Sequence, residues 1–207
     1  MEIKRLVLGM VRTNCYIVYN EDTKKAVIID PAADSDGIIE VVSGLGVVPE
    51  AVLLTHGHFD HMMAADDIRK EYHIPVCILN EEAELLQNAE LNGSQLFLRM
   101  SYAISADECL NDGQNLSYLD GKLTVIATPG HTAGSCCYYA KEEDILFSGD
   151  TLFQNSVGRI DLPTGQAAKL SRSIHEKLFV LPEQTLVLSG HGMETTIGEE
   201  KQHNPYV

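Results

Sequence analysis

Four side chains able to bind metal ions lie within the six residues from His56 to His61, in the order H-x-H-x-D-H. Neutral imidazole and ionised carboxylate groups are the donors that zinc and similar divalent cations take from proteins. His56 and His58 alternate along an extended segment, so both imidazoles can point to the same side. Asp60 and His61 follow at the turn into an expected helix and are not expected to fold back onto the same ion. The segment therefore predicts two metal ions close together.

Three more ligand-type residues follow short apolar segments, each directly after a glycine: His131, Asp150 and His191. Loops at strand ends are where α/β folds build their sites, and a glycine lets two backbones approach closely. We therefore expect these three residues to join the first four. The expected ligands are His56, His58 and His131 for one ion, Asp60, His61 and His191 for the other, and Asp150 as the bridge between them.

A pair of metal ions held in this way favours hydrolysis. Ions about 3.5–4 Å apart generate a hydroxide from water at neutral pH, which can attack an acyl carbonyl. Asp60 is the expected catalytic residue, because it could orient that hydroxide and accept its proton. No protein nucleophile is required, and Thr132 and Ser135 are expected to order the loop around His131. Zinc is the expected ion, with iron and manganese as alternatives, because His and Asp ligands accept all three.

The elements that must position these residues alternate between strands and helices. Short β-rich runs predict strands at Cys15–Tyr19, Ala26–Ile29, Ala51–Leu54, Val76–Leu79, Leu123–Ala127, Cys136–Ala140, Ile145–Phe147 and Leu186–Leu188. Helices are expected at about Asp36–Ser43, with Ser35 as the N-cap, and at His61–Tyr72, Glu81–Leu98 and Gln166–Phe179. Residues 100–115 show no clear pattern and are expected to be a connector or a lid near the substrate. The two β-rich halves predict sheets packed inside a helical shell, in a single α/β domain.

Composition narrows the partners. The chain has 30 Asp and Glu against 15 Lys and Arg, a formal charge of −15 that repels nucleic acid and anionic lipid. No apolar run approaches the roughly 20 residues needed to cross a bilayer. Five scattered cysteines, without C-x-x-C spacing, do not predict a disulfide framework. With no signal-peptide pattern at the N-terminus, a cytoplasmic protein is expected, and its oligomeric state stays open.

The complete set of motifs resembles the metallo-β-lactamase superfamily. The residues that carry the resemblance span nearly the whole chain and are Thr55–His61, Pro129-Gly130-His131-Thr132, Gly149-Asp150-Thr151 and Gly190-His191-Gly192. The resemblance implies a four-layer αββα sandwich of two mixed β-sheets flanked by helices, with two divalent metal ions at one edge of the sheets. It also implies the same seven ligands.

Residues 149–153 and 157–163 resemble the glyoxalase II-like branch, whose members hydrolyse glutathione thioesters such as S-lactoylglutathione. This implies a metal-bridging hydroxide that cleaves a small-molecule thioester. Arg159 stands where the branch carries a basic residue that contacts glutathione, so it would bind a substrate carboxylate unless it pairs with Asp161. Asp161 and Met193 replace tyrosines of the branch. The chain ends at Val207, so residues 1–207 are expected to form one domain without the C-terminal helical glutathione-binding extension.

Three other enzymes of this superfamily remain as alternatives. A persulfide dioxygenase would hold one iron with two His and one Asp, whereas all seven ligand positions are filled here. An RNA-processing nuclease is disfavoured by the charge of −15. A secreted β-lactamase is disfavoured by the missing export signal. A binding module without activity is the most distant alternative.

Overall fold

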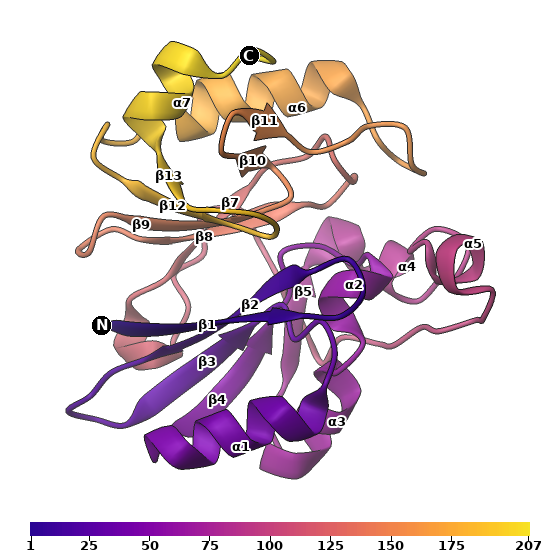
Figure 1. Cartoon of the computed structure of the whole chain (residues 1–207), viewed down its shortest axis with the longest axis vertical. Coiled ribbons are helices and arrows are strands. Elements are labelled where there is room, and N and C mark those ends of the chain that lie inside the picture. The colour runs from indigo at the N-terminus through magenta and orange to yellow at the C-terminus, as the bar shows by residue number, and fades with distance from the viewer.

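The computed structural model describes residues 1–207 and contains two β-sheets that face each other, with helices on their outer faces (Figure 1). The first sheet has the strand order β1-β2-β3-β4-β5-β6. Its strands are β1 (Glu2–Leu8), β2 (Thr13–Tyr19), β3 (Lys25–Ile29), β4 (Val48–Leu53), β5 (Val76–Leu79) and β6 (Glu108–Leu110). β1, β2 and β3 pair antiparallel, whereas β3 to β6 pair parallel.

The second sheet has the order β13-β12-β9-β8-β7. Its strands are β7 (Thr124–Ala127), β8 (Cys136–Ala140), β9 (Ile145–Gly149), β12 (Leu186–Ser189) and β13 (Thr195–Thr196). Only β9 and β12 pair parallel in this sheet. A separate hairpin joins β10 (Leu152–Phe153) to β11 (Ser156–Val157).

Helices cover the outer face of each sheet. α1 (Ser35–Leu45) and α3 (Ala65–Tyr72) lie against the first sheet, and α6 (Ala167–Ser173) and α7 (Ile197–His203) lie against the second (Figure 1). α6 continues into a π-helical turn, η3 (Ile174–Leu178). The remaining helical segments are short: α2 (Phe59–Met62), η1 (Asn80–Glu82), α4 (Ala83–Leu86), α5 (Ser94–Leu98) and η2 (Leu119–Gly121).

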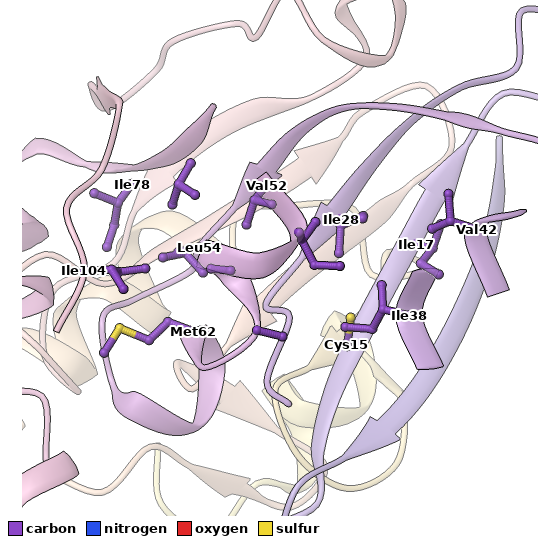
Figure 2. Close-up of a cluster of buried hydrophobic side chains, with 14 of the residues drawn as sticks. Cys15, Ile17, Ile28, Ile38, Val42, Val52, Leu54, Met62, Ile78 and Ile104 are labelled. Atoms are coloured by element: carbon purple, nitrogen blue, oxygen red, sulfur yellow. The ribbon is translucent and has the colours of Figure 1, made fainter. Parts of the chain in front are cut away.

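Three hydrophobic clusters fill the spaces between these four layers. Successive side chains of a strand point to opposite faces, and β2 shows this directly, because Ile17 packs in the outer cluster and Tyr16 packs between the sheets. β8 does the same in the second sheet, with Tyr138 between the sheets and Tyr139 toward the helices. Figure 2 shows the outer cluster of the first sheet, including Ile17. The predicted αββα sandwich of two mixed sheets is confirmed.

Hydrogen bonds to backbone carbonyls join the two sheets, two from backbone amides and one from a tyrosine hydroxyl. The amide of Cys136 in β8 donates to the carbonyl of Thr55 at 2.8 Å, and the Tyr138 hydroxyl donates to the carbonyl of Leu54 at 2.8 Å. The amide of Asn14 in β2 donates to the carbonyl of Gly190 at 2.7 Å. These hydrogen bonds therefore hold the loops that carry the expected ligands against each other.

Helix boundaries differ from the predictions where local bonds compete. α1 begins one residue earlier than expected, because Asp34, not Ser35, caps it by accepting from the amide of Gly37. The expected helix from His61 to Tyr72 is two helices, α2 and α3. The amide of Ala64 donates to the carbonyl of Pro31 at 2.9 Å instead of continuing the helix.

The single helix predicted from Glu81 to Leu98 is wrong. Asn88 forms a turn in which its side-chain oxygen accepts from the amides of Glu90 and Leu91. Gly93, at φ +81°, then reverses the chain ahead of α5. Asn side chains and positive-φ glycines favour turns over helix interiors, and together they divide this segment.

The unpatterned segment 100–115 connects α5 to the edge of the first sheet. Ile104 packs in the outer cluster of that sheet, and Leu110 packs between the sheets. Residues Glu108–Leu110 form the edge strand β6, parallel to β5. The helix expected from Gln166 to Phe179 spans α6 and η3, and Leu170, Ile174 and Leu178 pack on the second sheet. None of the helices has the length and hydropathy that crossing a bilayer would demand.

Candidate metal centre

The seven predicted ligand residues lie together at one edge of the two sheets. The first four follow β4, on the loop that leads into α2 and within α2 itself. The other three follow β7, β9 and β12, and β9 and β12 are parallel neighbours, so their loops leave the sheet at the same edge (Figure 1). Strand ends at a common edge explain why residues far apart in the sequence meet here.

Three imidazoles form the first group. His58 Nδ1 lies 3.0 Å from His56 Nε2 and 2.9 Å from His131 Nε2. All three side chains are buried. This is the set that the sequence predicts for the first ion.

Two imidazoles and a carboxylate form the second group. Asp60 Oδ2 lies 3.3 Å from His191 Nε2 and 3.6 Å from His61 Nε2. His61 is fully buried, whereas the His191 side chain is 28% exposed. This group matches the set predicted for the second ion.

Asp150 lies between the two groups. Its Oδ1 is 3.4 Å from His61 Nε2, and its Oδ2 is 3.5 Å from His191 Nε2. Oδ2 is also 3.7 Å from His131 Nε2 in the first group. A carboxylate in contact with both groups is in the position predicted for a bridging ligand.

The arrangement fits divalent metal ions. Four donors placed tetrahedrally 2.0–2.1 Å from a zinc ion lie about 3.3 Å from one another, close to the distances above. His61 Nε2 and Asp150 Oδ1 are buried and have no hydrogen-bond partner. Buried polar atoms without partners are costly in a folded protein. A bound cation would satisfy both atoms.

The opposite nitrogen of three imidazoles is held by the protein. His61 Nδ1 lies 2.9 Å from Asp30 Oδ2, and His131 Nδ1 lies 2.8 Å from the carbonyl of Arg159. His56 Nδ1 lies 3.2 Å from the Thr55 hydroxyl. Such partners place the proton on Nδ1 and leave the lone pair of Nε2 directed toward the site, as is typical of metal-binding histidines.

Two imidazoles of the first group, His56 and His58, are held in the neutral form. Burial lowers the pKa of His56 well below its usual value, and the neighbouring imidazoles lower it further. Burial also lowers the pKa of His58 to about 3. Neutral imidazole is the form that binds metal, and His56 and His58 are in that form at physiological pH.

Carboxylates surround the imidazole of His61 in the second group. Burial opposes a charge on His61, but Asp150, Asp60 and Asp30 together raise the pKa of His61 well above its usual value. Burial likewise opposes ionisation of Asp150, but His61 and the other imidazoles hold its pKa well below the usual range. A proton on His61 thus balances carboxylates that a divalent cation would balance instead.

Two glycines make the close packing possible, as the sequence suggested. A Cβ on Gly190 would overlap the carboxylate of Asp150 and lie 2.7 Å from His61 Cε1. A Cβ on Gly130, which has φ +149°, would overlap the backbone of Leu170 in α6. Any larger residue at either position would displace a candidate ligand or its loop.

Glu82 binds the backbone of two loops that carry candidate ligands, and the sequence analysis did not identify it. It is fully buried, and its carboxylate accepts the amide of Gly57 at 3.0 Å and the amide of Gly134 at 2.7 Å. Gly57 lies between His56 and His58, and Gly134 lies in the loop after His131. One carboxylate therefore connects the two loops that supply the first group. Burial raises its pKa despite these hydrogen bonds.

Asp30 was also missed, and it leads to a prediction. Its Oδ2 faces His61 Nδ1 and accepts from the Thr55 hydroxyl at 2.7 Å, and its Oδ1 accepts from the Thr55 amide at 2.8 Å. Asp30→Asn should remove the acceptor that fixes the His61 proton and lower metal affinity by about 10–100-fold. Competitive titration with a chromogenic chelator measures this affinity. Asp22→Asn, at an exposed carboxylate, is the control, and equal affinities in the two variants would contradict the role of Asp30.

A cavity of about 350 Å³ opens onto the ligands. Its walls include His58, Asp60, His131, Asp150 and His191. Beyond these candidate ligands, its lining consists of Val11, Phe59, Phe97, Phe153, Val157 and Leu162, together with Asn92 and Arg159. The site is therefore accessible to a small molecule, and this volume is typical of small-molecule pockets.

Arg159 lies on the wall of this cavity and is paired. Its Nε and Nη2 each donate to the carboxylate of Asp161 at 2.7 Å. Its guanidinium carbon lies 6.0 Å from the centre of the Phe97 ring. The sequence left open whether Arg159 binds substrate or pairs with Asp161, and the structure shows the pair.

Thr132 and Ser135 lie where the sequence predicts them, in the loop around His131, and the cysteines are unpaired. Thr132 Oγ1 lies 2.6 Å from Ser135 Oγ, inside the loop around His131. Cys136 and Cys137 are buried, and burial raises the pKa of the Cys137 thiol to about 11. All five cysteines are free thiols.

Comparison with known proteins gives consistent results. The family model described as "Metallo-beta-lactamase superfamily" matches residues 8–191. The "Probable metallo-hydrolase YqgX" of Bacillus subtilis is 40% identical over 208 residues, which cover all of this chain and 98% of that protein. The "Hydroxyacylglutathione hydrolase GloC" of Haemophilus influenzae is 33% identical over 209 residues, which cover all of this chain and 98% of that protein.

Two solved structures are also similar. The B3 metallo-β-lactamase BLEG-1 has 43% sequence identity and a TM-score of 0.94, with 99% of each chain covered. TTHA1623, solved in a di-iron-bound form, has 32% identity and a TM-score of 0.89, with 99% of this chain and 100% of that chain covered. At 43% and 32% identity, these two structures are similar to the chain in sequence as well as in fold.

Proposed function

Because the chain belongs to the metallo-β-lactamase superfamily, whose relatives include metal-dependent hydrolases, we propose that it hydrolyses a thioester with two divalent metal ions. One observation carries the proposal: the seven His and Asp side chains form two adjacent groups that share Asp150, at the base of an open cavity. Similarity to a hydroxyacylglutathione hydrolase supports the thioester. Similarity to a protein solved with two irons supports the dinuclear centre.

His56, His58 and His131 would hold one ion, Asp60, His61 and His191 the other, and Asp150 both. When bound, the ions would supply a nucleophile from water at neutral pH and polarise the substrate carbonyl. Zinc is the proposed metal, with iron or manganese as alternatives. Asp60 lines the cavity and accepts from the Thr13 hydroxyl at 3.2 Å. In that position it would act as catalytic residue, orienting the attacking water and taking up its proton.

The cavity favours a leaving group that needs no proton. Outside the candidate ligands, its only polar side chains are Asn92 and Arg159. An amide is not an acid at neutral pH, and a guanidinium does not give up its proton in proteins. A thiolate, with a thiol pKa of about 8.5, departs without protonation much more readily than an alkoxide or an amide.

Arg159 remains the proposed substrate contact. Its pair with Asp161 uses Nε and Nη2, which leaves Nη1 without a partner beside the cavity. A neutralised guanidinium of this kind suits a carbonyl or amide oxygen of the substrate.

The test is turnover by protein whose metal content has been measured. With two ions per chain, a thioester panel that includes S-lactoylglutathione should contain a substrate with kcat/KM of about 10⁴ M⁻¹s⁻¹ or more. Activity should disappear on chelation and return with zinc. If the protein holds both ions but cleaves no thioester, or hydrolyses a β-lactam faster than any thioester, the proposal is wrong. One iron per chain with oxygen uptake on glutathione persulfide would replace it with a dioxygenase.

A further inference from the structure

The cavity above the candidate metal centre has an apolar wall. Val11 comes from the turn between β1 and β2, Phe97 from α5, and Phe153 from β10. Val157 comes from β11, and Leu162 comes from the loop after it, which also carries Arg159. Four separate segments thus place apolar side chains around one opening, whereas a chance apolar residue on a surface has no such neighbours.

Parts of this wall are exposed although burial would stabilise them. The Phe97 side chain is 48% exposed, and Val11 is 48% exposed. Phe97 rests on Phe59, with ring centres 5.7 Å apart, so it has a defined place. An apolar group of a substrate would cover these side chains and gain the free energy of leaving water.

The polar side chains of the wall are already satisfied. Asn92 is fully buried, with its amide nitrogen donating to the carbonyl of Tyr102 at 2.8 Å and its oxygen accepting from the amide of Ser94 at 2.9 Å. Arg159 is the only cationic side chain on the wall outside the imidazoles, and Asp161 neutralises it. Outside the metal centre, a carboxylate at the cavity wall would therefore find no cation that is not already paired.

We propose that the substrates are thioesters with an apolar acyl group and no carboxylate that must be bound at the cavity wall. This inference rests on the proposed function and specifies its substrate class. S-Lactoylglutathione, with a polar acyl group and two carboxylates, is then a poor substrate. Each methylene buried against Phe97 and its neighbours should raise kcat/KM about fourfold, until the cavity is full.

The experiment uses N-acetylcysteamine thioesters, which carry no charge. Acetyl, butanoyl and hexanoyl thioesters are compared on zinc-loaded protein, with S-lactoylglutathione as the anionic, polar substrate. We expect kcat/KM to rise about 15-fold from acetyl to butanoyl, corresponding to two methylenes, and to be lowest for S-lactoylglutathione.

Three variants, one of them a control, test whether the wall causes the dependence of kcat/KM on the substrate. Phe97→Ala should flatten the dependence on chain length. Leu96→Ala is its control, because Leu96 precedes Phe97 on α5, is 64% exposed and does not line the cavity. Asp161→Asn should free Arg159 and raise the relative kcat/KM for S-lactoylglutathione. Metal content and melting temperature are measured for each variant, so that misfolding is recognised.

The outcomes separate this inference from the proposed function. If S-lactoylglutathione is cleaved best, or if kcat/KM does not rise with chain length, the protein is a thioesterase but the apolar acyl class is wrong. If the Phe97→Ala and Leu96→Ala variants keep the same chain-length dependence, the wall does not select the substrate. If no thioester is cleaved, the proposed function fails and this inference fails with it.

Discussion

Asp150→Asn should reduce the metal content from two ions per chain to one or none and lower thioesterase kcat/KM by at least about 100-fold. Asp150 is a carboxylate that lies close to both groups of candidate ligands, at 3.4 Å from His61 and 3.7 Å from His131. The substitution preserves shape but removes a negative charge and replaces an acceptor oxygen with a donor. Elemental analysis of the purified variant and a thioester assay measure the two effects.

Asp144→Asn is the matched control. Asp144 lies just before β9, the strand that carries Asp150 at its other end, and has φ +53°, a conformation that asparagine accepts. Its carboxylate bonds to Gln184 and Tyr139, away from the site. The control should retain both ions. An Asp150→Asn protein that also retained two ions and full activity would refute the bridging role.

Removal of the metal should lower the melting temperature by about 8–16 °C. A ligand present at 1,000 times its dissociation constant stabilises the native state by about 4.1 kcal/mol, and each kcal/mol corresponds to about 2–4 °C for a chain of this size. The structural reason is that His61 Nε2 and Asp150 Oδ1 are buried without a hydrogen-bond partner, and a bound cation would satisfy both. Calorimetry before and after chelation measures the shift.

Two controls test whether the fall in melting temperature is due to loss of the metal. Adding zinc back should restore the original melting temperature, and Asp150→Asn should show a smaller shift on chelation than the unmodified protein. If chelation removes both ions and the melting temperature stays the same, the buried groups do not depend on metal.

The placement of the candidate ligands followed from the sequence because two simple rules act together. Apolar runs such as Leu186–Leu188 indicated buried strands, and His191 stands just beyond the end of that strand. Parallel strands bring their ends to a common edge, so residues more than a hundred positions apart could be expected to meet. The layers followed from the resemblance of the motifs to a known family.

Other features depended on contacts that no local pattern contains. Asp30 and Glu82 are ordinary acidic residues until the fold brings His61 to the first and the Gly57 and Gly134 amides to the second. The apolar wall was missed for the same reason, because its residues come from separate segments. The break in the helix expected at Glu81–Leu98 is the exception, because Asn88 and Gly93 are local turn signals.

α7 was missed although a local signal was present. Thr196 and Glu199 have the spacing of a capping box, and the Thr196 hydroxyl accepts from the Glu199 amide at 3.2 Å. Edge strands such as β13, with two residues, have no comparable signal. Their pairing depends on the neighbouring strand and not on their own sequence.

The candidate ligands come from both sides of the sandwich, four from the loop after β4 and three from loops of the second sheet. Neither half alone supplies a full set for either ion, since His131 completes the first group and His191 the second. Ion capture during refolding must therefore wait until the halves have joined. Metal binding would thus report when the two halves of the chain have joined during refolding. With cobalt as the ion, the change in absorbance on binding would measure the rate of this step.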